Sequence, residues 1–450
     1  MRCRLLLLGV AVLAVAGCSG SGGAIVGPSA TATASAVRLP CTELSAPYAW
    51  AEEVTLDGQA RWRTLLAADS PDDTAPSVLE PLVDGPTTVF AQDGLVLGLS
   101  SASGRQVWSY TGPQLVSGLW QWRGVVVVLT TVEDVYTQLI GLDAATGAIR
   151  WRLNLPRGGV AGPPAATADG GLGLIRADGT LEVVSMATGV VRWTRSARSW
   201  LSLTALGSTE TTVVNGLMVN IDTQGLTTAD DVLIAVGDYG TIGYDDRTGS
   251  ARWKIADGLA LPVEPQQLFA DGDAVLASGN GGDIQFDALS AIAPASGRIV
   301  WQAVFRSARD SLVAGAGPAG VAVDDGSGVS LVDPRTGRQR WASGGVDGVE
   351  LVGRGDVVTI EEDQDGSSRL VDRDPANGRA RWSVPGFGQA AMAAGLLIVQ
   401  NAIAATLDAY RLGTGALAWR APLPAGYWLR LAVVPGGVLV QARMRECNAP

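Results

Sequence analysis

Short runs of apolar residues, separated at close intervals by glycine turns, dominate the hydrophobic pattern of this chain. Residues 125–131 (VVVVLTT) indicate a buried strand, and residues 171–184 indicate two strands around a turn at Ala177-Asp178-Gly179. Residues 232–245 (VLIAVGDYGTIGYD) are typical of a hairpin with a glycine turn. Outside the N-terminal segment there is little helical periodicity. The pattern therefore predicts an all-β protein made of many short strands.

A turn motif followed by tryptophan recurs nine times along the chain. Its fullest form is D-x-x-[T/N]-G, then three residues and a tryptophan, as in LDAATGAIRW, which ends at Trp151. Successive tryptophans are 46, 43, 42, 60, 48, 40, 41 and 37 residues apart, and the interval of 60 contains an insertion around 208–230. In every copy the glycine precedes the tryptophan by four residues; the pairs are Gly58 and Trp62, Gly104 and Trp108, Gly147 and Trp151, Gly189 and Trp193, Gly249 and Trp253, Gly297 and Trp301, Gly337 and Trp341, Gly378 and Trp382, and Gly415 and Trp419.

A period near 40 residues with one glycine turn and one tryptophan is typical of a propeller blade. The glycine supplies a left-handed turn residue, and the Asp or Ser that starts the turn can accept hydrogen bonds from backbone N–H groups two residues on. The tryptophan then falls at a fixed place on the next strand, where its wide ring can bury a large area between two blades. We therefore expect these glycines and tryptophans to be structural.

The copies resemble the PQQ-enzyme repeat, which is shared by pyrroloquinoline quinone dehydrogenases, the outer-membrane assembly lipoprotein BamB and many exported PQQ-like domains. The resemblance covers roughly residues 50–445 and implies an eight-bladed β-propeller with four-stranded antiparallel blades. Because nine motifs compete for eight places and the segment before Trp108 is short of one strand, we expect eight blades, with seven or nine as alternatives. Strand-like sequence at both ends predicts a last blade closed by strands from both termini.

The N-terminal segment predicts export and lipid anchoring. Arg2 and Arg4 precede an apolar run of twelve residues, Leu5 to Ala16, which is too short to span a bilayer. The run ends in VAGC, which resembles the lipobox of bacterial lipoproteins, where Cys18 receives a diacylglycerol; the alternative is an ordinary signal peptide with Cys18 incidental. We therefore expect a signal peptide at 1–17, a lipidated cysteine and flexible tether at 18–40, and the propeller at 41–450.

Two cysteines remain for the folded body once Cys3 is removed and Cys18 is lipidated. Cys41 stands just before the propeller and Cys447 lies three residues from the end of the chain. Exported proteins can form disulfides, so this placement predicts a disulfide between them if the two ends meet. The alternative is two free thiols.

The residue types present exclude several kinds of chemistry. A formal net charge of −11 disfavours nucleic acid and anionic lipid heads as partners. The sequence contains no His, so it has no Ser-His-Asp or Cys-His pair and no His-ligated zinc. The resemblance implies an adjacent cysteine pair in a PQQ dehydrogenase, and neither this pair nor a C-x-x-C-H haem motif occurs. We therefore predict no catalytic residue and no bound cofactor.

Other motifs are interpreted as structural. Acidic clusters at 227–231, 324–328, 361–366 and 372–374 could offer oxygen ligands to Ca²⁺, but none matches an EF-hand loop, so we interpret them as β-turns and predict no metal site. Gly237, Gly240 and Gly243 resemble a nucleotide-binding loop only loosely. Trp120 and Trp122 would project to one side of a strand, as blade packing or as a binding surface for protein or sugar.

Taken together, the sequence predicts a monomeric, non-enzymatic scaffold, lipid-anchored at the outer face of the cell membrane, which binds other envelope proteins as BamB does. The first alternative is a propeller that binds or senses a small ligand. The second is a divergent PQQ-dependent dehydrogenase.

Overall fold

The computed structural model describes residues 49–444, apart from gaps at 67–78, 80, 93, 113, 133–134, 156–159, 161–163, 177–178, 197–210, 215–216, 221–224, 238–239, 257–263, 272–273, 281–285, 307–312, 318, 325–327, 345–347, 354, 363–367, 386–388, 402–403, 424–426 and 435. Its regular elements are the strands β1 to β38. In this part of the chain no helix is long and apolar enough to cross a membrane. The all-β prediction is confirmed.

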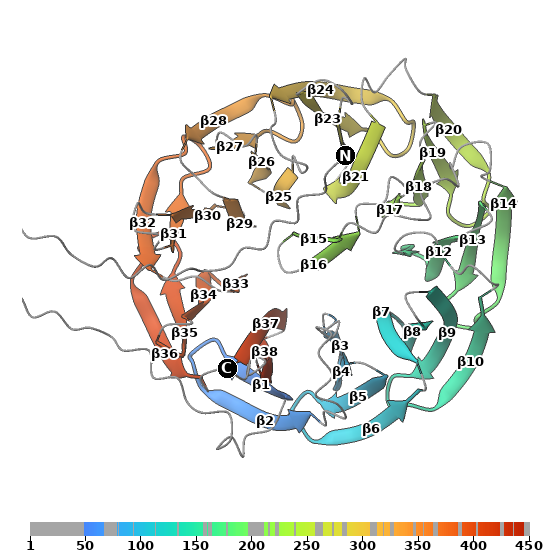
Figure 1. Cartoon of the computed structure of the whole chain (residues 1–450), viewed down its shortest axis with the longest axis horizontal. Helices are drawn as coiled ribbons and strands as arrows, with labels where there is room; N and C mark the ends of the chain where they lie inside the picture. The colour runs from blue at the N-terminus through green and yellow to red at the C-terminus, as the bar shows by residue number, and fades with distance from the viewer. Residues whose placement is uncertain are drawn as a thin grey trace, which may run out of the picture. The chain divides into compact units, whose positions relative to one another are not determined.

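Nine sheets of four antiparallel strands, here called blades 1 to 9, follow one another around a ring (Figure 1). Blade 1 contains β37 (Tyr427–Val434), β38 (Gly437–Met444), β1 (Ala49–Thr55) and β2 (Ala60–Leu66). Blade 2 contains β3 (Leu82–Asp84), β4 (Thr87–Gln92), β5 (Leu95–Ser100) and β6 (Gln106–Thr111), and blade 3 contains β7 (Leu115–Trp122), β8 (Val125–Val132), β9 (Val135–Asp143) and β10 (Ile149–Asn154). Blade 4 contains β11 (Ala165–Ala166), β12 (Gly171–Ile175), β13 (Thr180–Ser185) and β14 (Val191–Ser196). Blade 5 contains β17 (Gly225–Ala229), β18 (Val232–Gly237), β19 (Gly240–Asp245) and β20 (Ala251–Ala256).

The remaining strands complete the ring. Blade 6 contains β21 (Glu264–Asp271), β22 (Ala274–Asn280), β23 (Phe286–Ile292) and β24 (Ile299–Arg306), and blade 7 contains β25 (Val313–Gly317), β26 (Gly320–Asp324), β27 (Gly328–Val332) and β28 (Gln339–Gly344). Blade 8 contains β29 (Gly348–Val352), β30 (Val357–Glu362), β31 (Ser368–Arg373) and β32 (Ala380–Pro385). Blade 9 contains β33 (Ala390–Ala393), β34 (Leu396–Asn401), β35 (Thr406–Arg411) and β36 (Leu417–Pro422). A two-stranded hairpin, β15 (Thr211–Val214) and β16 (Leu217–Asn220), lies in the insertion that the long motif interval indicated.

The blade count corrects our expectation of eight and matches one of the alternatives. The structure has nine four-stranded sheets because each tryptophan motif has a blade of its own. Sequence inspection missed β3 of blade 2, which is only three residues long and pairs through Leu82 with Val89. So short a strand has no apolar run that would reveal it.

Blade 1 joins the two ends of the chain, as predicted. β1 pairs antiparallel with β38 from Ala49 opposite Arg443 to Thr55 opposite Gly437. Strands from the C-terminus form its inner half and strands from the N-terminus form its outer half. This pairing closes the ring with ordinary backbone hydrogen bonds.

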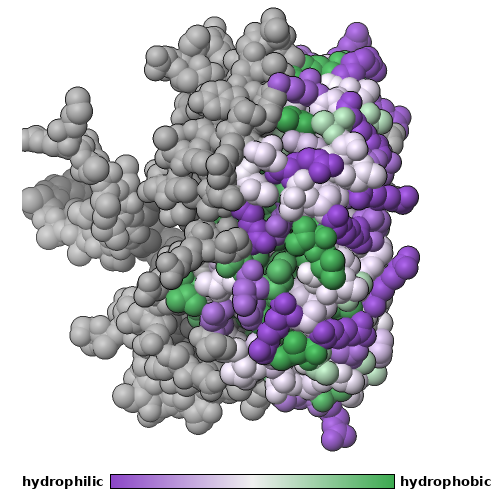
Figure 2. Space-filling view, turned by 90° about the vertical axis from the view of Figure 1, so that its right-hand side faces the viewer, coloured by the Kyte–Doolittle hydropathy of each residue, from purple (hydrophilic) through white to green (hydrophobic). Residues whose placement is uncertain are grey.

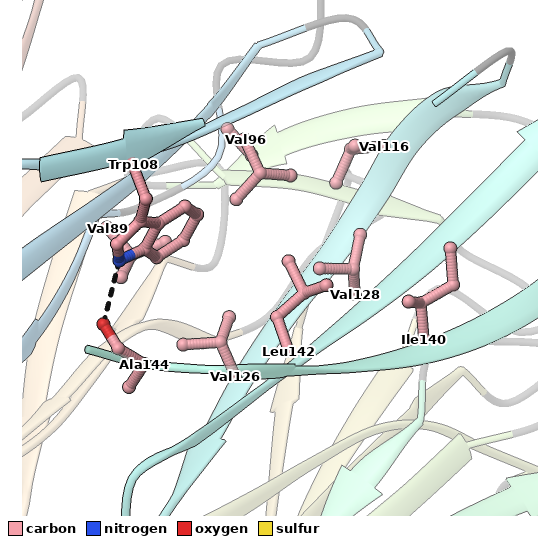
Figure 3. Close-up of a cluster of buried hydrophobic side chains, with 10 residues drawn as sticks. Val89, Val96, Trp108, Val116, Val126, Val128, Ile140, Leu142 and Ala144 are labelled. Atoms are coloured by element: carbon pink, nitrogen blue, oxygen red, sulfur yellow. Dashed lines mark hydrogen bonds between the residues drawn. The ribbon is translucent and has the colours of Figure 1, made fainter. Parts of the chain in front are cut away.

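The hydrophobic core lies in the seams between neighbouring blades. In the seam of blades 2 and 3, Val89, Val96 and Trp108 contact Val126 and Leu142 (Figure 3). Burying a side chain of this size stabilises a fold by about 1.5–3 kcal/mol. Because each seam holds such a cluster, the blades are held mainly by their neighbours.

The nine motif tryptophans repeat one contact around the whole ring. Each indole lies against the turn glycine of the following blade, and Trp419 of blade 9 lies against Gly58 of blade 1. The nine motif glycines have φ between 65° and 84°. Eight indole N–H groups donate to a backbone carbonyl of the following blade at 2.5–3.1 Å, with acceptors in Ser101, Ala144, Met186, Asp246, Pro294, Pro334, Pro375 and Leu56. Tryptophan and glycine therefore form one continuous set of seam contacts.

Candidate functional site

The turn face is the edge of the ring formed by the nine motif turns, each between the third and fourth strand of a blade. It includes residues 56–59 of blade 1 and the equivalent turns up to 411–416 of blade 9. Chain reversal in an antiparallel blade places the turns between first and second strands at this same edge. Loops usually carry the function of such scaffolds, so the turn face is a candidate functional surface.

Aspartates that begin the motif turns hold them closed. Oδ1 of Asp143 accepts hydrogen bonds from the backbone N–H groups of Ala145 at 3.1 Å and Thr146 at 2.9 Å. Asp245 and Asp333 form the same pair of bonds in their turns. These bonds satisfy backbone groups that the tight turn leaves unpaired, as Asx turns generally do.

Arginines directly before the motif tryptophans pair with these aspartates. Nη2 of Arg150 lies 2.6 Å from Oδ2 of Asp143, and Arg340 and Asp333 repeat this pair at 2.6 Å. Sequence inspection missed these pairs, although the spacing of seven residues between acid and base was visible. In each pair the guanidinium holds the pKa of the carboxyl below its usual range. A carboxylate so engaged is poorly suited to general acid–base catalysis.

Asp372, opposite Trp382 on the third strand of blade 8, is a buried carboxyl whose pKa is strongly raised. Its side chain is fully buried, and Nη2 of Arg381 donates to its Oδ1 at 2.8 Å. Nε of Arg381 lies 2.7 Å from Oδ2, but this oxygen accepts no well-aligned hydrogen bond. Burial raises the pKa of Asp372 to about 6, against the opposing effect of Arg381. Although this pKa would suit an acid catalyst, no substrate could reach the buried group.

Asp246, which follows the motif aspartate of blade 5, is a second buried carboxyl. It is 2% exposed, and its backbone carbonyl accepts the indole N–H of Trp193 at 2.8 Å. Burial raises its pKa, with further contributions from Asp169 and Asp231. The equivalent residues in several other turns are alanine, methionine or proline, so Asp246 places a carboxyl in a seam position that is apolar in those turns.

Asp372 should make stability depend on pH. Its folded pKa lies above the unfolded value near 3.8, so the folded state binds the proton more tightly and loses stability as pH rises through about 6. Between pH 4.5 and 7.5 we expect wild type to lose about 2 kcal/mol relative to Asp372→Asn, because a shift of one pKa unit is worth about 1.4 kcal/mol. Urea unfolding of both proteins measures this, and Asp246 titrates equally in both. If the unfolding free energies of wild type and Asp372→Asn changed equally with pH, the prediction would be wrong.

The acidic clusters lie in blade hairpins. Asp231 pairs with Arg252 at 2.5 Å, Glu361 accepts from Arg369 at 3.0 Å, and Asp374 accepts the N–H of Ala376 at 2.7 Å. Residues 325–327 and 363–367 lie outside the described part of the chain. Within that part, no three acidic or cysteine side chains are grouped so that they could hold a metal ion.

The remaining sequence motifs also belong to the blades. Gly237 and Gly240 lie in the hairpin of β18 and β19, and Gly243 lies beneath the ring of Trp253. Trp120 and Trp122 both contact the core cluster between blades 3 and 4. The two indoles therefore pack in a seam.

Figure 2 shows the side of the ring where β10, β14 and β20 form the outer edge, and hydrophilic residues predominate over hydrophobic ones in its coloured part. Hydrophobic residues form only small, separate patches within that part. Exposed apolar residues there include Ile149, Val190 and Val191. Scattered apolar residues are normal on a protein surface, so the coloured part of this side does not indicate a large apolar interface.

Cys18, Cys41 and Cys447 lie outside the described residues. The lipidation of Cys18 and the disulfide between the other two therefore stay predictions. The ends of β1 and β38 lie side by side, where Ala49 pairs with Arg443.

Nine four-stranded blades with one tryptophan contact per seam define a PQQ-like β-propeller. A family profile described as "Outer membrane protein assembly factor BamB" matches residues 122–255, 218–383 and 285–427, which together cover more than half of the chain. The chain therefore belongs to the BamB family.

The individual relatives share low sequence identity with this chain. BamB of Moranella endobia (strain PCIT) is 29% identical over 175 residues, which are 36% of this chain and 42% of that protein; the chain therefore spans less than half the length of this relative. The crystal structure of BamB from Moraxella catarrhalis is 15% identical, with 84% of this chain and 99% of that chain covered and a TM-score of 0.42. A quinohemoprotein alcohol dehydrogenase from Pseudomonas putida HK5 is 14% identical, with 82% and 75% covered and a TM-score of 0.45.

Proposed function

We propose that this protein is a non-enzymatic scaffold of the cell envelope, which binds other envelope proteins during their assembly. Membership of a family described as an assembly factor is the observation that carries this proposal. The fold alone does not select it, because propellers of this type host unrelated functions.

The carboxylates of the turn face support the same proposal. Asp143, Asp245 and Asp333 are engaged by arginines and backbone N–H groups, and Asp372 is buried. The sequence also lacks histidine and the adjacent cysteine pair of the quinoprotein enzymes. Partner binding needs none of these groups, whereas a dehydrogenase would need a reactive base near its substrate.

Affinity purification tests the proposal. The tagged full-length protein is cross-linked in cells, extracted from gently solubilised membranes and purified, and the stoichiometry of co-purified envelope proteins is measured. A stable stoichiometric partner is the expected result. Thermal stabilisation by a small ligand with no partner would favour the sensory alternative, and alcohol oxidation after loading with PQQ and Ca²⁺ would favour an enzyme.

We further propose that Cys18 carries the membrane anchor and holds the propeller at the outer face of the membrane. The support is the VAGC string after a short apolar run. Buried acyl chains contribute about 0.8 kcal/mol per CH₂, so two or three chains make attachment durable. The remaining 22 residues of the tether, Ser19 to Pro40, have a root-mean-square span of about 25 Å.

Cys18→Ala should move the protein from the membrane fraction to the soluble fraction. The matched control is Cys3→Ala, which changes a cysteine inside the proposed signal peptide and should leave the protein membrane-bound. Ultracentrifugation and immunoblotting measure both. Membrane retention of Cys18→Ala at the wild-type level would show that the anchor lies elsewhere.

The disulfide between Cys41 and Cys447 is also proposed. Its support is the pairing of Ala49 with Arg443, because Ala49 follows Cys41 by eight residues and Arg443 precedes Cys447 by four. Such a bond would fasten the two halves of blade 1 and would restrict the unfolded chain.

A further inference from the structure

Three arginines occupy the same position in three consecutive blades of the turn face. Arg298, Arg338 and Arg379 each follow the motif glycine directly, in blades 6, 7 and 8. Their carbonyls accept the N–H of the residue five positions earlier at 2.9, 2.9 and 3.0 Å, so the three backbones are held alike. Arg335 lies within the same turn of blade 7. All four side chains are exposed, and we call them the basic arc.

Among the described residues, no contact uses the charges of the basic arc. No guanidinium of the arc has an ion pair or hydrogen bond among the described residues. By contrast, Arg340 and Arg381, on the following strands, pair with Asp333 and Asp356. The paired arginines stabilise the turns, whereas the arc leaves four fixed positive charges exposed on a protein whose formal net charge is −11.

The basic arc runs along neighbouring blades. Trp301 of blade 6 contacts Gly337 of blade 7, and Trp341 of blade 7 contacts Gly378 of blade 8, so each arginine turn adjoins the next. Figure 1 shows the outer strands β24, β28 and β32 in succession along the ring. The charges therefore form a row that crosses two seams.

We propose that the basic arc binds an extended acidic segment of a partner protein. Because the arginines belong to three successive blades, an extended chain that follows the ring can meet all three positions. Guanidinium groups bind carboxylates through paired N–H donors, and charge complementarity also speeds encounter with the right partner. This inference rests on the proposed scaffold function and specifies the chemistry of its partner.

The course of the chain favours a protein over the bilayer as the occupant. β1 begins at Ala49, at the edge of blade 1 opposite to the motif turn at 56–59. The seven residues of β1 separate these two edges by roughly 20 Å. A tether that leads to Ala49 from a membrane anchor enters the propeller on the side away from the arc.

Binding of labelled poly-L-glutamate to the full chain tests the proposal. The arc variant is Arg298→Glu, Arg338→Glu and Arg379→Glu; the control is Arg105→Glu, Arg152→Glu and Arg411→Glu, which changes the net charge equally at exposed arginines of blades 2, 3 and 9. We expect the arc variant to bind about tenfold more weakly and the control within about twofold of wild type, because exposed ion pairs each contribute modestly. Binding should weaken with salt. Circular dichroism checks that both variants fold.

Three results would overturn the proposal: no binding of poly-L-glutamate by wild type, equal losses in both variants, or arc-dependent binding of phosphatidylglycerol vesicles in its place. Affinity purification distinguishes a failure of the arc proposal from a failure of the scaffold proposal. If the arc variant retains a stoichiometric envelope partner that wild type binds, the arc is rejected and the scaffold stands. If poly-L-glutamate binding depends on the arc but no envelope partner is recovered with wild type, the scaffold fails and so does the partner assigned to the arc.

Discussion

Gly147→Ala is expected to destabilise the propeller by about 2–5 kcal/mol. Gly147 has φ of 69°, a left-handed conformation that costs other residues about 1–2 kcal/mol. A Cβ at this position would lie 2.6 Å from Cε3 of Trp108, which is too close for any real contact. The indole would have to move out of the seam between blades 2 and 3, and such overpacking costs a further 1–3 kcal/mol or so.

Gly124→Ala provides the matched control in the same blade. Gly124 has a similar φ of 76°, but a Cβ there would meet nothing within 4 Å. Only the left-handed strain remains, so a loss of about 1–2 kcal/mol is expected. Urea unfolding of the two variants measures the difference. Equal losses would mean that the tryptophan contact contributes nothing beyond backbone strain.

Trp108→Phe should cost about 2 kcal/mol more than Trp382→Phe. The indole N–H of Trp108 donates to the carbonyl of Ala144 at 2.9 Å in the seam between blades 2 and 3 (Figure 3). Phenylalanine would leave that carbonyl buried and unpaired, which costs about 1–3 kcal/mol. The indole N–H of Trp382 is buried and has no hydrogen-bond partner among the described residues. Its replacement therefore loses no hydrogen bond.

Urea unfolding of Trp108→Phe and Trp382→Phe measures the difference between their losses of stability. Both rings pack beside a motif glycine, so the loss of aromatic area is similar. A third variant, Trp108→Ala, should lose about 3–5 kcal/mol because it also opens a cavity. If Trp108→Phe and Trp382→Phe were equally stable, the indole hydrogen bonds would contribute little to the ring.

The repeat made much of the fold predictable. A glycine and a tryptophan four residues apart determine a turn and its following strand, and nine copies determine a ring of such units. The blade count was harder to predict, because β3 has three residues and no apolar run. The acceptors of the indole N–H groups lie 33 to 53 residues further on in most copies, so the spacing within one motif could not reveal them.

The properties of individual carboxyls depended on tertiary burial. Asp372, Arg373 and Asp374 are consecutive, and the sequence pattern indicates a single acidic turn. Asp372 is buried beside Arg381, Arg373 pairs with Glu361, and Asp374 holds the turn. Successive residues of a strand point to opposite faces, so neighbours in sequence meet different surroundings. Sequence alone could not assign a pKa near 6 to the first of them.

The shared blade sets an order for folding in the cell. Because β1 pairs with β38, β1 has no inner neighbour during synthesis until β38 has been made. Contacts so distant in sequence form slowly, and an unpaired strand edge invites association with other chains. Completion of the eight-residue strand β38 therefore marks the step at which the two halves of blade 1 can pair and close the ring.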